Sequence, residues 1–218
     1  MCLIRFLCAF CLLFCIYGFA DKKMVYDSCT AGVSTKTDWT IVAGEDKVFL
    51  DGKNPRSDIK IECSPNYALL RYFEKSEAAS KELDIRKEGP YLMIKSKEKG
   101  KEKAKSFKIG DTPWVQEFKF GFREFLKGNQ KEYTFYIVNP KDLDVHEMIA
   151  TKESIEKLEV RGVVYNAQKI KVTLKGFKKR FWKAYVWFDK ELVHMIRYLA
   201  NEGPGTSYTE TDLVSIEG

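Results

Sequence analysis

The sequence is poor in the residues that mark several protein classes. Six prolines and 14 glycines among 218 residues are too few for a fibrous chain, and a hydrophobic fraction of 44% is too high for general disorder. The formal net charge is only +6, from 37 Lys and Arg against 31 Asp and Glu, which is less than a dedicated nucleic-acid-binding protein usually carries. We therefore expect a folded protein that does not bind nucleic acid.

The sequence motifs of common enzyme classes are also absent. No Gly-Xaa-Ser-Xaa-Gly turn, phosphate-binding loop or glycine-rich dinucleotide turn occurs, and the two histidines, His146 and His194, lack the spacing of a zinc protease. Both histidines fall in strand-like runs, so we interpret them as structural side chains with satisfied hydrogen bonds. Two catalytic carboxylates could be hidden among the 31 acids, but no pattern singles them out. We predict no catalytic residue, no metal and no cofactor.

A long hydrophobic run occurs only at the N-terminus. Arg5 precedes the apolar stretch 6–17, and Gly18-Phe19-Ala20 places small residues at the third and first positions before a cut. This pattern predicts a secretory signal peptide over residues 1–20. The stretch is shorter than the roughly 20 apolar residues of a membrane-spanning helix, which disfavours the alternative of an uncleaved anchor. We expect residues 21–218 to form a single exported β-rich domain without a transmembrane span.

Two cysteines lie beyond the predicted signal peptide, Cys29 and Cys63. An exported protein meets an oxidising compartment, and a bond between them would close a loop of about 35 residues, worth roughly 3–4 kcal/mol in the chain-entropy model. The alternative is two buried thiols without a function. Their spacing is not that of a redox or zinc motif. We predict a structural disulfide.

The remainder of the chain consists of short strand-like runs separated by turns. Residues 58–62 alternate between polar and apolar side chains, and Asp51-Gly52 and Asn54-Pro55 are turn signals. No helix-length crossover separates these runs, so consecutive strands should be antiparallel. The pattern predicts a mainly β fold with a single strongly curved antiparallel sheet, which forms a half-open or closed β-barrel.

One segment has helical periodicity. Thr112-Pro113 is typical of a helix start and Gly128-Asn129 of a helix end. Between them, aromatic residues recur at multiples of three or four positions, at Trp114, Phe118, Phe122 and Phe125. We predict one amphipathic α-helix that packs on the sheet through this aromatic stripe.

The run 181–188 is apolar on both faces of a strand, so both faces must be covered. The cover could be the curl of the sheet itself, or an apolar ligand in a barrel that does not close. A packed interior without a ligand is the other interpretation, because aromatic side chains usually fill cores. The candidate ligand-lining residues are Trp114, Phe118, Phe122, Phe125, Tyr185 and Trp187.

Lysines occupy every second position from Lys95 to Lys105. In one extended strand they would form a cationic stripe that could bind an anionic headgroup, with Lys97, Lys99 and Lys101 as candidates. The alternative is a solvated hairpin that turns at Gly100 and uses its lysines to discourage edge pairing. We favour the hairpin.

The C-terminal half has an order of segments that resembles uncharacterised secreted envelope proteins of Gram-negative bacteria. These segments are 114–126, Phe135-Tyr136-Ile137-Val138-Asn139-Pro140, Glu159-Val160-Arg161-Gly162, 167–172, 181–189 and Glu202-Gly203-Pro204-Gly205-Thr206. The fold of these proteins is similar to the unclosed β-barrel of periplasmic lipoprotein carriers of the LolA/LolB type. The resemblance covers roughly residues 107–216 and implies an architecture rather than a set of functional residues.

These observations lead to an ordered set of functional hypotheses. The first is a soluble periplasmic protein of a Gram-negative bacterium that binds an apolar or lipidic ligand, such as a lipid or a lipoprotein acyl chain, in a half-open barrel. The second is an envelope protein–protein interaction module whose barrel is filled by its own side chains. An enzyme without a recognisable motif is the third.

Overall fold

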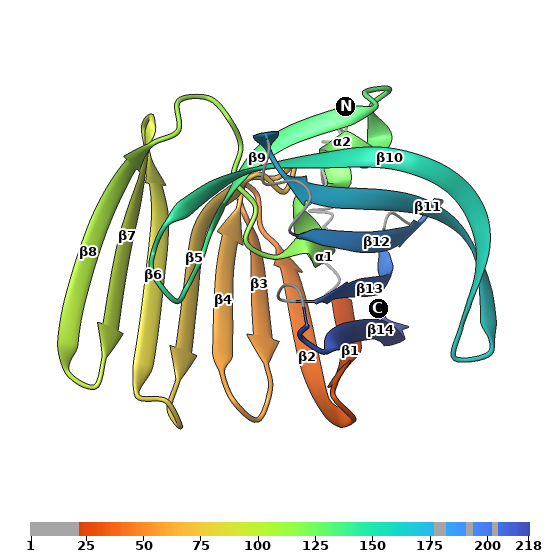
Figure 1. The fold of residues 1–218 in the computed structure, drawn as a ribbon, viewed down its shortest axis with the longest axis horizontal. Helices are drawn as coiled ribbons and strands as arrows, with labels where there is room; N and C mark the ends of the chain where they lie inside the picture. The colour runs from red at the N-terminus through yellow and green to blue at the C-terminus, as the bar shows by residue number, and fades with distance from the viewer. Residues whose placement is uncertain (1–21, 177–181, 191–193, 202–204) are drawn as a thin grey trace, which may run out of the picture.

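Fourteen strands of the described chain form one antiparallel sheet that does not close (Figure 1). The computed structural model describes residues 22–176, 182–190, 194–201 and 205–218, so the predicted signal peptide lies outside the described residues. The strands are β1 (Lys22–Thr30), β2 (Val33–Ala43), β3 (Val48–Lys53), β4 (Asp58–Cys63), β5 (Leu69–Ser76), β6 (Lys81–Glu88), β7 (Tyr91–Glu98), β8 (Lys101–Lys108), β9 (Glu132–Val138), β10 (Val145–Val160), β11 (Val163–Leu174), β12 (Lys183–Asp189), β13 (Met195–Asn201) and β14 (Tyr208–Glu217). The predicted fold class is confirmed.

The sheet consists of two meanders that meet in its middle. Strands β1 to β8 follow one another on one side, β9 to β14 follow one another on the other, and β1 pairs with β14. In Figure 1 the second meander turns away from the plane of the first, so that the two halves enclose a concave face. The helical residues, α1 (Phe118–Gly121) and α2 (Arg123–Lys127), lie between the halves, and the chain that carries them joins β8 to β9.

The core lies on the concave face because apolar residues alternate with polar ones along the strands. In β3, Val48 and Leu50 are buried while Phe49 and Asp51 are exposed, and in β4 the buried residues are again every second one. Residues with a period of two point to the same face of a sheet, so one face is apolar and the other is polar. The observed burial therefore follows directly from the sequence pattern that predicted the strands.

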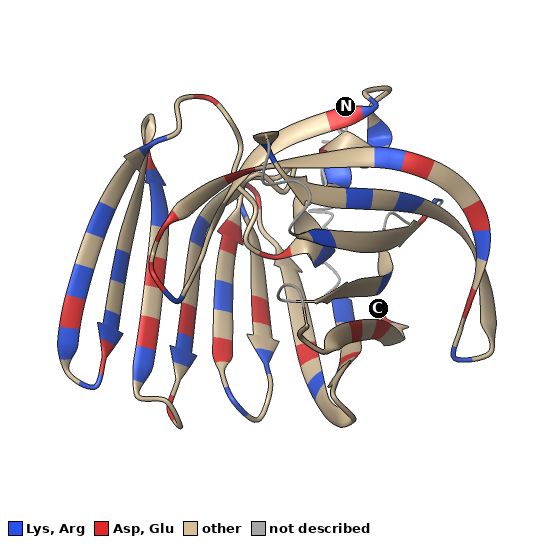
Figure 2. Cartoon of the chain, in the orientation of Figure 1, with Lys and Arg blue, Asp and Glu red and all other residues tan. Residues whose placement is uncertain are grey.

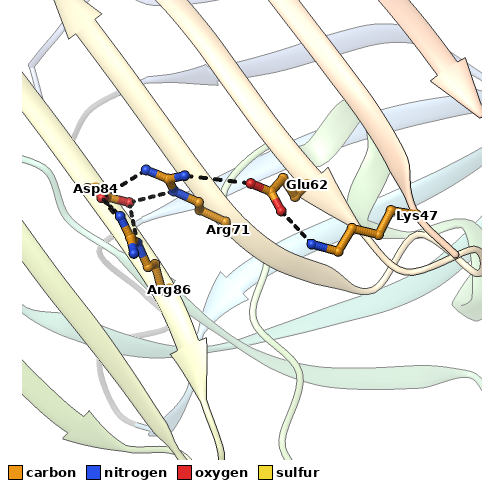
Figure 3. Close-up of polar contacts among 5 residues, drawn as sticks. All are labelled: Lys47, Glu62, Arg71, Asp84 and Arg86. Atoms are coloured by element: carbon orange, nitrogen blue, oxygen red, sulfur yellow. Dashed lines mark hydrogen bonds and ion pairs between the residues drawn. The ribbon is translucent and has the colours of Figure 1, made fainter. Parts of the chain in front are cut away.

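A chain of ion pairs crosses the opposite, convex face (Figure 3). Arg71 donates from Nε and Nη2 to the two carboxylate oxygens of Asp84 at 3.0 and 3.1 Å, and Arg86 donates to the same carboxylate at 2.6 Å. The carboxylate of Glu62 forms ion pairs with both Arg71 and Lys47, at N–O distances of 3.6 and 2.8 Å. Opposite charges on neighbouring strands stabilise their pairing by roughly 0.2–1 kcal/mol each. Ion pairs thus link β4 to β5 and β5 to β6 on this face.

Strands β10 and β11 form a long hairpin that bends away from the rest of the sheet (Figure 1). The bend falls where the pairing register shifts between Lys152 and Ile155. At the tip, Arg161 donates from Nη2 to the carboxylate of Asp27 in β1 at 2.6 Å. Because a bulge adds one residue to only one strand, it bends the hairpin, and the ion pair then holds the tip against β1.

The predicted disulfide between Cys29 and Cys63 is wrong, because both thiols are free. Cys29 lies opposite Ser34 near one end of β2, whereas Cys63 lies opposite Val48, which pairs with Ala43 at the other end of β2. The two cysteines are therefore separated by about 30 Å along the strand direction. A disulfide requires Cα atoms within about 7 Å, so this fold does not allow the bond.

Candidate binding surfaces of the concave sheet

The predicted aromatic helix is shorter than expected and is divided in two. Residues 112–117 are not helical: Trp114 forms a parallel bridge with Tyr136 of β9, and the backbone amide of Val115 donates to the carbonyl of Tyr136 at 2.8 Å. The side chain of Gln116 adds two hydrogen bonds to the backbone of Val138. These bonds satisfy the open edge of β9, which explains why the chain stays extended up to residue 117 in spite of its helical periodicity.

The helical residues 118–127, which we name the covering segment, then form two short turns. Phe122 separates α1 from α2 with φ −111° and ψ 8°, and neither turn has a side-chain cap at its N-terminus. An isolated helix of fewer than about 12 residues is marginal in water. The covering segment is therefore held in place by the packing of its side chains on the sheet.

Three of the predicted ligand-lining residues come together beneath the covering segment. Phe122 is fully buried and packs edge-on against Phe135 and Phe188, with ring centroids 5.3 and 6.1 Å away. Phe118 packs on Phe122 at 5.5 Å, and Phe125 packs on Phe122 at 6.5 Å. We name Phe118, Phe122, Phe125, Tyr133, Phe135 and Phe188 the aromatic cluster. Its ring contacts connect the covering segment to β9 and β12.

The other predicted lining residues do not belong to the aromatic cluster. Trp114 is buried, but its indole Nε1 donates to the carbonyl of Leu69 in β5 at 3.0 Å. Val186 of β12 pairs with Tyr198 of β13, which contacts Phe118 of the covering segment, so Val186 points to the concave face. Tyr185 and Trp187 point to the other face, because side chains alternate along a strand. On that outer face the ammonium group of Lys169 lies over both rings, and Trp187 donates to Glu156 at 2.7 Å.

The lysine run forms the hairpin that we favoured. Lys99 and Gly100 have φ values of +49° and +79° and make a two-residue turn between β7 and β8, which is the usual geometry of a tight hairpin. Because the chain reverses there, Lys97 shares a face with Glu102, and Lys101 shares the other face with Glu98. The three candidate headgroup lysines therefore do not form one surface. Strand β8 is the free edge of the sheet, and Figure 2 shows the basic residues along it.

A polar hollow of about 500 Å³ lies beside the apolar core, on the same face of β1 and β2. Ser28 and Thr30 continue the inward-facing series of Met24 and Tyr26, so the core gives way to hydroxyl groups within one strand. The residues that line the polar hollow are Ser28, Thr30, Val33, Thr35, Thr37, Asn54, Arg56, Ser57, Glu74 and Ser76. Sequence reasoning missed this hollow, although serine and threonine at every second position were a visible signal.

A second feature that the sequence did not reveal is a contact between Lys22 and His194. The Nζ atom of Lys22 lies 2.8 Å from Nε2 of His194, which is 7% exposed. Burial, together with the charges of Lys22 and Arg123, lowers the pKa of His194 to about 4. His194 is therefore neutral near pH 7 and accepts a hydrogen bond from the ammonium group. The histidine is partnered, as predicted, but its partner is a cation.

Two features relevant to function are absent from the described part of the chain. Within residues 22–176 and the three shorter described ranges, no group of three or more His, Cys, Asp or Glu side chains is arranged to hold a metal ion. No helix in these ranges is long and apolar enough to cross a membrane.

Comparison with known proteins gives similarities of fold. No protein-family model matches the chain, and no curated protein matches it in sequence. The solved structures that resemble it include the hypothetical lipoprotein YmcC from Escherichia coli K12, with a TM-score of 0.35 and 11% identity over 88% of this chain and 86% of that one.

Two further similar structures carry names that refer to the LolA superfamily and to lipoprotein sorting. A LolA superfamily protein from Nitrosomonas europaea gives a TM-score of 0.33 and 9% identity, with 92% of this chain and 87% of that one covered. A domain named for outer membrane lipoprotein sorting, from Vibrio parahaemolyticus, gives 0.25 and 6%, with 92% and 86% covered. These three structures are similar to this chain at 11% sequence identity or less.

Proposed function

We propose that the protein is an exported binding protein that holds an apolar or lipidic ligand against the concave face of its unclosed sheet. The observation that carries this proposal is the relation between the aromatic cluster and the covering segment. Phe135 and Phe188 are buried on the concave face beneath Phe122, yet only two short uncapped helical turns separate that face from solvent. A ligand reaches the apolar surface when it displaces these turns.

The energetics favour displacement of the covering segment over displacement of a strand. Each strand is fixed by backbone hydrogen bonds on its neighbours, whereas the ten residues of the covering segment are fixed mainly by side-chain packing. An acyl chain offers the aromatic cluster the same kind of apolar contact, at roughly 25 cal/mol per Å² of buried surface. Ligand entry therefore exchanges one apolar contact for another.

The proposed compartment is the periplasm, and the proposed ligand class includes lipids and lipoprotein acyl chains. The compartment follows from the apolar run 6–17 and the small residues before position 21. Amino-terminal sequencing of the protein exported by a Gram-negative host should read Asp21 as the first residue. Retention of residues 1–20 would overturn the proposed signal peptide.

A second candidate function is a protein–protein interaction module with a filled interior. It is favoured by one observation: the aromatic rings beneath the covering segment are already in mutual contact, with Phe122 and Phe135 fully buried. On this hypothesis the covering segment is permanent core, and partners bind elsewhere on the sheet.

Substitutions at Glu124 separate the two candidates. Glu124 is exposed on α2 and, among the described residues, forms an ion pair only with Lys127, at 3.5 Å. Glu124→Gly weakens a helix by about 1 kcal/mol relative to Glu124→Ala, while both variants lose the same ion pair. If the covering segment must open, the glycine variant binds a fluorescent fatty acid about fivefold more tightly than the alanine variant.

The outcome against the lipid proposal is equally defined. Native mass spectrometry of protein isolated from the periplasm should detect co-purified lipid. The carrier proposal would be overturned, and the interaction module favoured, if the purified protein contained no lipid and neither the wild type nor Glu124→Gly bound the fluorescent fatty acid.

A further inference from the structure

A small cavity of about 30 Å³ lies next to the covering segment, at the end of the sheet where β1 begins. It is lined by Lys22, Ile41, Tyr67, Lys119, Phe120, Arg123 and His194. These residues come from β1, β2, the turn before β5, the covering segment and the start of β13. The cavity thus lies where several distant parts of the chain meet, and its lining includes both cationic groups and the apolar side chains of Ile41 and Phe120.

The cationic groups of this cavity have donors to spare. Lys22 directs its ammonium group to His194 at 2.8 Å, which uses one of its three hydrogens. The Nε–H of Arg123 is buried and has no hydrogen-bond partner among the described residues, while the guanidinium group stacks 4.2 Å above the ring of Tyr67. A buried donor without a partner costs about 1–3 kcal/mol. An oxygen atom that entered the cavity could satisfy this donor.

Positive charge also exceeds negative charge around the cavity. Lys119 is compensated by Glu117, whose carboxylate lies 2.9 Å from its ammonium group. Within the described part of the chain, neither Lys22 nor Arg123 is in an ion pair with a carboxylate, while the charge of Asp189 favours the protonated form of His194. Both cations in turn disfavour protonation of His194. The field at the cavity is therefore suited to an anion.

The size and the walls of the cavity restrict the kind of anion. A space of about 30 Å³ accommodates roughly two water-sized atoms, which matches the two oxygens of a carboxylate better than the four of a phosphate. Phe120 lines the cavity and packs 4.9 Å from Trp39, so the wall of the cavity continues into the apolar core. A ligand with an acidic head and an apolar body fits both parts.

We propose that Lys22 and Arg123 form a carboxylate-binding site for the head of a long-chain carboxylic acid. Once the covering segment has closed again over the ligand, the carboxylate accepts hydrogen bonds from Arg123 Nε and from Lys22 Nζ, and the chain extends past Phe120 beneath the covering segment. This inference rests on the proposed function and specifies its ligand class.

The chain's two histidines provide a direct measurement of this site. His194 contacts Lys22 in the cavity, while His146 lies in β10 and serves as an internal control. Proton NMR of the purified protein should show that decanoate raises the pKa of His194, because a negative charge favours the protonated ring. The ring-proton signals of His146, recorded at one fixed pH, should not move when decanoate is added. Decanol, which has the same chain length without the charge, should not raise the pKa of His194.

Variants test which cations hold the carboxylate. Arg123→Gln should weaken decanoate binding at least tenfold, whereas Lys127→Gln, which removes an exposed cation from the same helical turn, should change it less than twofold. Lys22→Met is the second variant in case Arg123→Gln does not fold, and Lys23→Met on the neighbouring exposed position is its control. Equal affinity of decanoate and decanol, with no effect of either cavity variant, overturns the site but leaves the carrier function standing.

Acetate and inorganic phosphate complete the experiment. If acetate raises the pKa of His194 while decanoate binds no better than acetate, the carboxylate site stands and the carrier function fails. If phosphate acts as strongly as acetate, the preference for a carboxylate is wrong. If none of the three anions affects His194, the proposal is overturned.

Discussion

Gly52 of β3 lies directly opposite Trp39 of β2, and the indole ring covers the position that a side chain at residue 52 would occupy. A Cβ atom added to Gly52 would come within 2.7 Å of the Trp39 ring, which is too close for a van der Waals contact. Trp39 is itself 1% exposed and packs against Phe120 of the covering segment. The small size of Gly52 therefore determines how closely the covering segment approaches the sheet.

Gly52→Ala should lower the free energy of unfolding by about 1–3 kcal/mol, because overpacking displaces the Trp39 ring. Urea denaturation followed by tryptophan fluorescence measures this change. Asp51→Ala, on the exposed face of the same strand, should cost less than about 0.5 kcal/mol. Equal stability of the Gly52→Ala variant and the wild type would show that Trp39 does not occupy this position.

In the absence of a reductant, Cys29 and Cys63 should differ in their reactivity toward a thiol reagent. Cys29 is exposed, whereas Cys63 is buried and its burial raises the pKa of the thiol to about 12. A thiol reagent should therefore label one cysteine in the native chain from residue 21 onward and two after denaturation. Labelling that appears only after reduction would indicate a disulfide and contradict the separation of the two residues.

The ion pairs of the convex face should contribute to stability in a salt-dependent manner. Burial alone would raise the pKa of Asp84, but hydrogen bonds from Arg86 and Arg71 outweigh it and lower the pKa. The contribution of Asp84 is thus present above its unfolded pKa near 3.8 and is lost as the pH falls below it. Asp84→Asn should cost about 1 kcal/mol at low salt and less at 1 M salt, measured by thermal unfolding.

The matched control for Asp84 is Asp46→Asn, in an exposed turn. This variant should leave the melting temperature nearly unchanged at either salt concentration. If the stability lost in Asp84→Asn did not depend on salt concentration, the side chain of Asp84 would act through packing and not through its charge.

His194 should make the protein less stable in mild acid. Its folded pKa of about 4 lies below the ordinary value of 6.5, and the groups that face it are Lys22 from β1, Arg123 from α2 and Asp189 from β12. The unfolded chain then binds a proton between pH 6.5 and 4 that the folded chain does not, so stability is full above pH 6.5 and falls as the pH decreases. Between pH 7 and pH 5 the loss should be about 2 kcal/mol.

The variant His194→Gln isolates this effect. Its free energy of unfolding should change by about 2 kcal/mol less than that of the wild type between pH 7 and pH 5, as measured by urea denaturation at both values. Parallel pH dependences of the two proteins would mean that His194 is not held neutral.

The β architecture could be predicted because local sequence and tertiary packing agree. The alternation in 58–62 places Ile59 and Ile61 on the core face, and Lys99-Gly100 fits a tight turn that requires positive φ. At Trp114 the local sequence pattern and the tertiary interactions favour different structures. Its spacing to Phe118 is helical, yet the open edge of β9 offers backbone hydrogen bonds to an extended chain, and this tertiary interaction overrides the local preference.

The candidate site was harder to predict for a different reason. The aromatic cluster was partly visible, since Phe118, Phe122 and Phe125 recur on one side of a helix. Lys22 and His194, in contrast, are 172 positions apart and meet only because the first and the last strands of the domain lie near each other. A single sequence contains no periodicity that could report such a meeting.

The pairing of β1 with β14 has a consequence for how the chain acquires its structure. Each meander can form hairpins from neighbouring segments, but the seam between them joins Lys23 to Glu217 and Thr30 to Thr209. Formation of this seam costs the loop-closure entropy of nearly the whole chain before its hydrogen bonds contribute any stability, and this cost slows folding. A chain synthesised from its N-terminus therefore holds β1 without one of its two partner strands until β14 has been made.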